Sequence, residues 1–320
     1  MAECKLLIQN GSYIQQCVVE EGIVLETARR KTAGKLSFTV LKDEALDFQE
    51  GNPVIFMYNG QKVFYGFVFT KERSNNEKIK VVAYDALRYF KNKDTYVYTK
   101  KTASQILKML IADFKLKFGL VDDTKYVIPS GAEDNKELFE IVQNALDQTT
   151  QATGAMYVLF ADHNGINLKN MKDMKLNILI DETTSESFSY STSIDSETYN
   201  KIKLVYENKD KGKREIYIAQ DSSNQNRWGV LQYFESIQSN TNGKLKADTL
   251  LKLYNKKTRK LSINKVKGDI RVRGGSLLPI MLHLGDMTVS NHMVVESAKH
   301  TFTESQHTMD LVFIGGEFNA

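Results

Sequence analysis

The chain is poor in the residues that usually mark secreted or metal-binding proteins. Its 320 residues include two cysteines, three prolines, one tryptophan and five histidines. The two cysteines, Cys4 and Cys17, provide no disulfide framework, which fits synthesis in a reducing cytoplasm. Three prolines and no Pro/Gly/Ser-rich stretch predict domains that pack closely, without long tethers.

Long apolar runs and a dominant charge are also absent. No stretch of roughly 18 apolar residues is present, so neither a transmembrane helix nor a membrane anchor is expected. The segment from Met1 to Gln16 lacks the regions of a signal peptide. Lys and Arg total 43 against 39 Asp and Glu, a net charge of +4. That balance is too even to predict nucleic-acid binding by itself.

Alternating segments predict that the first ~95 residues form a sheet. Residues 36–40 and 79–83 alternate apolar with mostly polar side chains, which indicates strands with one buried face. Asn59-Gly60 between two apolar runs is a strong hairpin signal, because both residues tolerate positive φ. This pattern is typical of a barrel or a small sandwich.

Two helices are predicted after residue 100. Apolar residues at helical spacing follow the capping-box pair Thr102 and Gln105. A second amphipathic segment follows Asp134 and Glu137, which supply its start signal. A hairpin comes next, with a turn predicted at 162–165.

The order of these patterns predicts a mainly β protein with an α+β insert. Strand-like alternation returns after residue 180 and is interrupted by one helix near Tyr254. We therefore expect a first β-domain at 1–98, an α+β insert at 99–180, and a second β-domain at 181–320 that contains the inserted helix.

Motifs for catalysis, metal binding or cofactor binding are not found. No histidine stands in a zinc-protease spacing, although His300 and His307 flank a predicted turn and could approach each other across a hairpin. Gly268–Ser276 is glycine-rich but lacks the Gly-Lys-Ser/Thr ending of a phosphate loop. We predict a strand at Ile270–Arg273 there. The expectation is a non-enzyme without cofactor or metal.

The seven residues Tyr-Asp-Ala-Leu-Arg-Tyr-Phe that begin at position 84 form the most informative segment. We predict that Asp85 caps a short helical turn over 86–90, with Arg88 one turn further on. Leu87, Tyr89 and Phe90 are predicted to plug the first β-domain.

The two cysteines are predicted to be neighbours. A two-residue turn at Asn10-Gly11 would place Cys4 directly opposite Cys17, on an apolar side shared with Tyr13. Their Cα atoms would then be about 4.5–5.5 Å apart. We expect both thiols to be buried, reduced and structural.

Five segments resemble, in order, the XkdQ/YqbQ-type tail proteins of PBSX-like prophages. They are the opening block with 34–40, 66–69 and 84–90, then 213–221, 227–235, 268–276 and 307–311. Because the segments cover nearly the whole chain in order, the resemblance is specific.

The resemblance implies two β-barrel-like tube domains of the contractile-tail hub type. The implied function is a structural baseplate hub of a contractile phage tail or phage tail-like bacteriocin. A homotrimer would form a pseudo-sixfold ring that adapts the sixfold tail tube to the threefold central spike. Tube and spike proteins are the implied partners, with the tape-measure protein as a further candidate. Nucleic acid would be met only if DNA passes through the lumen.

The same resemblance implies synthesis in a bacterial cytoplasm and then a place in an extracellular virion or tail-like particle. No fused lysozyme or spike module is expected. Two other classes stay open: a tail-associated cell-wall hydrolase, whose carboxylate pair is visible only in space, and an OB-like nucleic-acid binder that stacks bases on the aromatic residues at 56–69.

Overall fold

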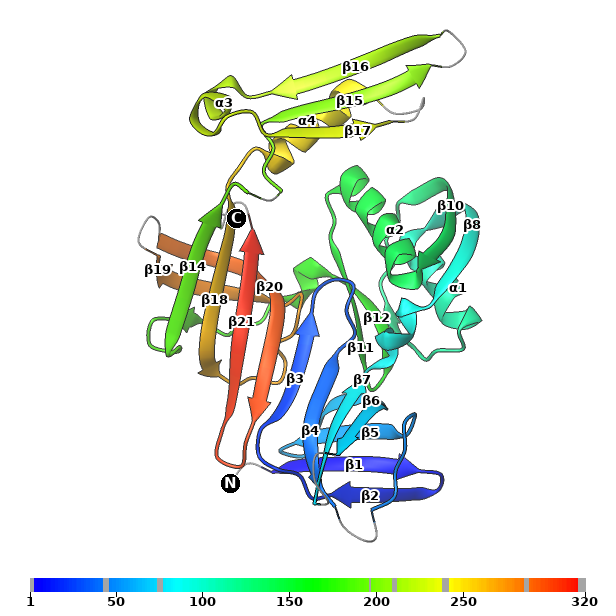
Figure 1. Ribbon diagram of the computed structural model, residues 1–320, viewed down its shortest axis with the longest axis vertical. Coiled ribbons are helices and arrows are strands. Elements are labelled where there is room, and N and C mark those ends of the chain that lie inside the picture. Colours follow the sequence, from blue (N-terminus) through cyan, green and yellow to red (C-terminus); the bar gives the residue numbers. More distant parts are fainter. Residues whose placement is uncertain are drawn as a thin grey trace. The chain divides into compact units, whose positions relative to one another are not determined.

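A computed structural model describes residues 3–42, 46–73, 77–195, 197–208, 212–237, 242–284 and 288–315. The chain divides into two compact units. Unit 1 consists of Met1–Phe188, Ser262–Leu282 and His292–Phe313, and unit 2 of Ser189–Leu261, His283–Asn291 and Ile314–Ala320. Strands predominate (Figure 1), and the helices of unit 1 belong to the middle of the sequence. The predicted mainly β class with an α+β insert is confirmed.

The N-terminal strands of unit 1 form a closed β-barrel. They are β1 (Cys4–Asn10), β2 (Tyr13–Cys17), β3 (Ile23–Ala28), β4 (Lys35–Leu41), β5 (Pro53–Tyr58), β6 (Gln61–Arg73) and β7 (Lys78–Tyr84). Their hydrogen-bonded order is β3-β4-β7-β6-β5-β1-β2. After β2 the chain returns to β4, where Val19 pairs with Val40 and the Leu41 amide donates to the Val18 carbonyl at 2.9 Å. Strands β4-β7-β6-β5-β1-β2 therefore close on themselves, which selects a barrel over a sandwich.

Alternation along these strands fills the barrel. Every second side chain of β4 and β7 is buried in one apolar core. The predicted hairpin is confirmed, since Asn59 (φ 48°) and Gly60 (φ 76°) connect β5 to β6. Phe56 and Phe64 lie in this core, at 0% and 5% exposed. These two aromatic rings are therefore unavailable for stacking on bases.

The predicted register of the N-terminal hairpin is wrong by two residues. Leu6, not Cys4, pairs with Cys17, and the turn begins at Gly11 (φ 59°). Because the shift is even, Cys4 and Cys17 stay on one face. As diagonal neighbours they are expected roughly 7–8 Å apart at Cα, farther than the predicted separation.

A side-chain contact explains the shift. Asn10 remains in β1 and donates its amide Nδ2 to the Asp47 carboxylate at 3.1 Å. This long-range bond favours Asn10 in the strand over Asn10 in the turn. Tyr13, predicted on the apolar side, is 75% exposed.

The α+β insert follows the barrel in the chain. Its elements are the 3₁₀ helix η1 (Ala86–Lys91), β8 (Lys93–Thr102), α1 (Ala103–Asp113), β9 (Phe118–Val121), β10 (Val127–Glu137), α2 (Leu138–Thr153), β11 (Tyr157–Asp162), β12 (Gly165–Asn170) and the 3₁₀ helix η2 (Met171–Met174). Two small sheets, β10-β8 and β11-β12-β9, pack with both helices around a second core. The predicted hairpin is confirmed, with Asp162 paired to Gly165.

One of the two predicted helix starts is correct. The Thr102 hydroxyl accepts from the Gln105 amide at 3.3 Å, and the Gln105 side chain accepts from the Thr102 amide at 2.9 Å. Helix α2 begins later than Asp134 predicts, because β10 continues through Glu137. Glu137 becomes the N-cap residue, and its amide donates to the Glu140 carboxylate at 3.3 Å.

The C-terminal strands continue the sheet of the barrel. They are β13 (Ile180–Asp181), β14 (Ser187–Ser193), β18 (Thr258–Lys267), β19 (Leu277–His283), β20 (Thr288–Phe302) and β21 (His307–Gly315). Their order is β14-β18-β21-β20, and β19 pairs with both β20 and β13. Strand β20 also pairs with β3, from Ser297 opposite Ala28 to Phe302 opposite Ile23. The two β-regions are therefore joined by hydrogen bonds. That both are barrel-like tube domains, as the resemblance implies, stays a prediction.

Unit 2 contains a sheet of its own, which the sequence pattern does not distinguish from the second β-domain. Its elements include β15 (Lys201–Asn208), β16 (Lys213–Gln220), α3 (Ser222–Trp228), β17 (Gln232–Ser236) and α4 (Gly243–Tyr254). The sheet order is β16-β15-β17, and α4 covers one face, where Leu250 packs with Ile202 and Leu204. The sequence predicts this segment inside the second β-domain, with a single helix. The structure instead gives it two helices and its own core.

Candidate functional site

Asp85 joins the barrel to the insert. It follows β7 and is the N-cap of η1, where its carboxylate accepts from the Leu87 amide at 2.9 Å. Its other oxygen accepts from the Gly34 amide at 2.8 Å, and the Asp85 amide donates back to the Gly34 carbonyl at 2.9 Å. A Cβ at Gly34 would lie 2.5 Å from the carboxylate, so only glycine fits there. The predicted cap is confirmed.

The prediction that Leu87, Tyr89 and Phe90 plug the first β-domain is wrong. Leu87 and Phe90 are 2% and 0% exposed, but they lie in the core of the insert, not of the barrel. Tyr89 and Arg88 contact the outer side of β6: the Arg88 guanidinium carbon is 5.2 Å from the Phe69 ring centroid, and the Tyr89 ring is 6.0 Å from it. Successive residues of η1 therefore hold both neighbouring regions.

The junction loop, residues 268–276, meets this joint from the C-terminal part of unit 1. The predicted strand at Ile270–Arg273 is absent, and turns replace it. A Cβ at Gly274 would lie 2.3 Å from the Ala28 backbone, and the Gly274 amide donates to the Thr27 hydroxyl at 3.0 Å. Close backbone approach thus explains the glycine, with no need for a phosphate ligand.

Arg273 of the junction loop lies half-buried between the barrel and the insert. One guanidinium nitrogen donates to the Ala161 carbonyl at 3.1 Å, and the guanidinium carbon lies 4.0 Å from the Phe160 ring centroid. Burial raises the pKa of the Asp85 carboxyl to about 7, while its backbone donors and the charge of Arg273 act to lower it. Burial also lowers the pKa of Arg273, although a guanidinium stays protonated in proteins. Asp85 and Arg273 thus offset each other's charge in the interior.

Two histidines extend the buried polar cluster. His300 Nε2 lies 2.9 Å from the Val272 carbonyl, so it must donate there, which leaves Nδ1 to accept from His307 Nε2 at 2.9 Å. The predicted approach of His300 and His307 is confirmed. Burial lowers the pKa of each imidazole to about 4, helped at His300 by the neighbouring His307. Asp269 opposes this at His307. The pair is therefore neutral at pH 7.

The histidine pair predicts loss of stability in acid. The unfolded chain binds protons near pH 6.5 and the folded pair near 4, so the contribution is complete above pH 6.5 and is lost as the pH falls towards 4. Between pH 7.5 and 5.0 the loss is about 2 kcal/mol for one imidazole. Urea unfolding at both pH values should show it in the wild type and less of it in His300→Gln. The exposed His163→Gln should behave as wild type, and equal pH slopes in all three proteins would contradict the assignment.

Both cysteines line one pocket of the barrel. Burial raises the pKa of the Cys17 thiol to about 11, and burial with the charge of Glu304 raises that of Cys4. We expect Cys17 to react about a hundredfold more slowly with Ellman's reagent at pH 8 in the folded protein than in urea, because thiolate is scarce. Cys4→Ser isolates the Cys17 thiol for this measurement. A folded Cys17 that reacts as fast as free cysteine would show that it is not structurally protected.

The described segments contain neither a metal-binding cluster nor a membrane-spanning helix. No group of three or more His, Cys, Asp or Glu side chains is placed to hold a metal ion. No described helix has the length and apolar character needed to cross a membrane. The polar side chains of the junction instead bind mainly backbone groups of neighbouring segments, so the arrangement fastens the barrel, the insert and the C-terminal strands. Sequence reasoning found Asp85 through its capping position but missed Arg273, for which only the adjacent Gly274-Gly275 gave a signal.

The fold is shared with prophage tail proteins. The 43 kDa tail protein of prophage MuSo2 from Shewanella oneidensis matches 97% of this chain and 96% of its own, with a TM-score of 0.70 at 10% identity. A type VI secretion component of E. coli, reported to resemble the T4 bacteriophage tail proteins gp27 and gp5, matches 97% of this chain and 75% of its own, with a TM-score of 0.57 at 12% identity. The chain therefore has the fold found in phage tail proteins and in this type VI secretion component.

The sequence matches narrow this fold class to a family. The YqbQ-like family model matches residues 23–313. YqbQ of Bacillus subtilis (strain 168) is 30% identical over 304 residues, which cover 92% of this chain and 91% of YqbQ. XkdQ of the phage-like element PBSX from the same strain is 27% identical, with 92% of each chain covered. The chain belongs to the YqbQ-like family, and the predicted resemblance is confirmed.

Proposed function

We propose that this chain is a non-catalytic structural protein of a phage tail or tail-like particle, and that within it the chain is the baseplate hub. The observation that carries the proposal is a closed barrel joined through β20 to a second set of strands. A prophage tail protein shares the fold over nearly its whole length. The type VI component with gp27-like and gp5-like structure supports the place near the spike.

In this role three copies form a ring between the sixfold tube and the threefold spike. Two β-regions in each chain give six in a trimer, which is the number that a sixfold tube requires. We propose the division 1–98, 99–180 and 181–320, with a rotation of roughly 60° between the two β-regions. Exposed apolar side chains on β2 and just after it, those of Tyr13, Ile14 and Val18, support an assembled state. Exposed apolar patches often mark contact surfaces between proteins.

The test is reconstitution with the tail tube and spike proteins of the parent particle. Native mass spectrometry should find three copies of this chain per spike, and electron microscopy of the parent particle should place them where the tube meets the spike. Isolated protein is expected to be monomeric at low concentration, because ring contacts depend on partners. Complexes that never reach threefold stoichiometry would contradict the assignment of this chain as the hub.

Two control assays address the other function classes. A cell-wall hydrolase clears peptidoglycan in a zymogram, and a nucleic-acid binder shows binding that weakens steeply with salt. We expect neither peptidoglycan clearing nor salt-sensitive binding of nucleic acid. Clearing by the purified chain would overturn the non-catalytic assignment while leaving the family unchanged.

A further inference from the structure

An acidic pocket opens at the start of strand β3. It has a volume of about 590 Å³, and its floor includes the apolar side chains of Ile23 and Phe302. Its lining contains four glutamates, Glu3, Glu20, Glu21 and Glu304, and no lysine or arginine. An apolar floor under a carboxylate rim suits a long aliphatic stem that ends in a positive charge.

Most of this negative charge is not neutralised by the described residues. Glu20 pairs with Lys78. Glu3, Glu21 and Glu304 are exposed, and none of them forms an ion pair with any described residue. The pocket therefore presents three carboxylates to solvent beside an apolar floor.

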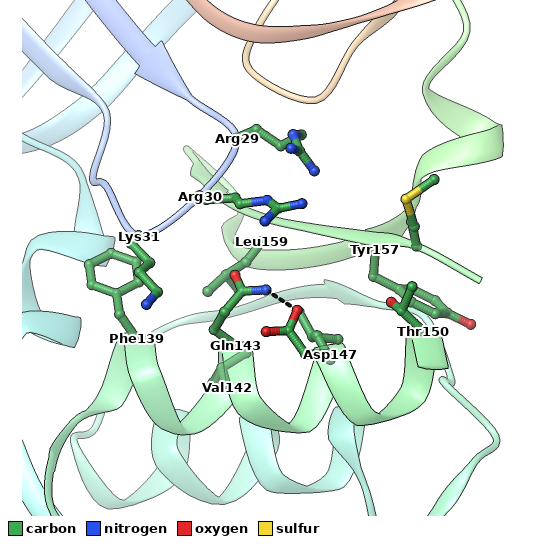
Figure 2. A pocket seen from close by; sticks show the side chains of 12 residues that line it. Arg29, Arg30, Lys31, Phe139, Val142, Gln143, Asp147, Thr150, Tyr157 and Leu159 are labelled. Atoms are coloured by element: carbon green, nitrogen blue, oxygen red, sulfur yellow. Dashed lines mark hydrogen bonds between the residues drawn. The ribbon is translucent and has the colours of Figure 1, made fainter. Parts of the chain in front are cut away.

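A basic loop lies at the other end of the same strand. Arg29, Arg30 and Lys31 follow β3 directly and line a small cavity of about 70 Å³ over α2. Figure 2 shows Arg29 and Arg30 side by side above the helix, from which Gln143 and Asp147 point towards them.

The end of this loop is positively charged and exposed. Arg29 is held by Glu296 at 2.7 Å, and burial, followed by repulsion from Arg30, lowers the pKa of Arg29. Arg30 and Lys31 are exposed and form no ion pair within the described part of the chain. Lys31 also has a φ of 51°, in the left-handed region. Non-glycine residues keep such a conformation at a cost and often at contact sites.

The pocket and the loop are complementary but cannot meet within one chain. Strand β3, Ile23–Ala28, separates them, and six extended residues span roughly 20 Å. Two different patches that fit each other on one chain define a head-to-tail contact between copies. Repetition of such a contact closes into a ring when the rotation between copies permits it.

We propose that the acidic pocket of one copy receives the Arg30–Lys31 loop of a neighbouring copy. The aliphatic stems lie on the apolar lining of the pocket, where Val18 is 63% exposed, and the charged heads meet Glu3, Glu21 and Glu304. The proposal rests on the proposed hub function, since a ring of identical subunits requires one contact of this head-to-tail kind.

Charge reversal tests the contact. Glu21→Lys and Arg30→Glu are each expected to weaken self-association in the reconstituted complex by about tenfold at low salt, because each places like charges together. The double variant Glu21→Lys/Arg30→Glu restores opposite charges at every interface and should recover association to within about threefold of the wild type. Glu72→Lys and Lys169→Glu reverse exposed charges elsewhere and serve as controls. Native mass spectrometry over a concentration series gives the assembled fraction, and thermal melting confirms that each variant folds.

An independent measurement uses the reactivity of Cys4, with both charged patches unchanged. Cys4 lines the same pocket and is partly exposed, so alkylation of Cys4 in the Cys17→Ser variant should slow at least fivefold when copies assemble. Single reversals that leave a threefold complex unchanged, with Cys4 equally reactive in both states, would overturn this inference and leave the hub function standing. Self-association that depends on the charge swap, but without threefold stoichiometry, would reject the hub and retain the contact. A wild type that never self-associates would reject both.

Discussion

Replacing Arg273 by alanine is expected to lower the free energy of unfolding by about 1–3 kcal/mol, the range for leaving buried polar groups without their partner. The side chain is half-buried, and its guanidinium bonds to the Ala161 carbonyl and lies over the Phe160 ring. Its removal leaves the Asp85 carboxyl without its positive neighbour, which should raise the pKa of that carboxyl further. Urea unfolding followed by circular dichroism measures the loss.

Arg271 provides a matched control two residues away. Its side chain is 63% exposed and pairs with Asp269 at 2.6 Å. Arg271→Ala should therefore cost less than about 1 kcal/mol, as exposed ion pairs do. Equal losses for the two arginines would show that Arg273 is not an anchor of the junction.

A double-mutant cycle measures the coupling between Arg273 and Asp85. Asp85→Asn keeps the shape of the cap but removes the charge, so Arg273→Ala should cost less in that background. A coupling above about 0.5 kcal/mol is expected. Additive losses would mean that the two groups stabilise the junction independently.

Local signals were enough to predict the parts of the fold that depend on neighbouring residues. The hairpin at Asn59-Gly60 needs two residues with positive φ, and the start of α1 needs a reciprocal bond between Thr102 and Gln105. Both are visible in the sequence because each involves residues at most three apart. Asp85 was found for the same reason, since it caps the turn that follows it.

Features that depend on distant partners were missed. Asn10 stays in strand β1 because Asp47, far along the chain, accepts its amide, and no local pattern reveals this. The junction loop is irregular because its glycines approach β3, although its alternating sequence suggests a strand. Unit 2 was not separated from the second β-domain, since its strands show the same alternation and only the pairing order distinguishes them.

The place of Leu87 was also decided by tertiary packing. Leu87 and Phe90 of η1 enter one core, whereas Tyr89 contacts the outer side of β6. The sequence indicates that apolar side chains here are buried, but not which core receives them. The barrel core is closed by its own strands, so Leu87 and Phe90 pack with the helices of the insert. A substitution at Leu87 is therefore expected to weaken the insert and not the barrel.

Leu87→Ala is expected to destabilise the protein by about 2–5 kcal/mol, because it leaves a cavity where a side chain only 2% exposed was packed. Since Leu87 belongs to the core of the insert, amide hydrogen exchange should accelerate in α1 and α2 before it does in the barrel strands β5 and β6. Leu120→Ala is the matched control: Leu120 is 79% exposed in the same region, so its truncation should cost less than about 0.5 kcal/mol. Faster exchange confined to the barrel strands would show that Leu87 belongs to the barrel core. A negligible change in stability would argue that its side chain is not buried at all.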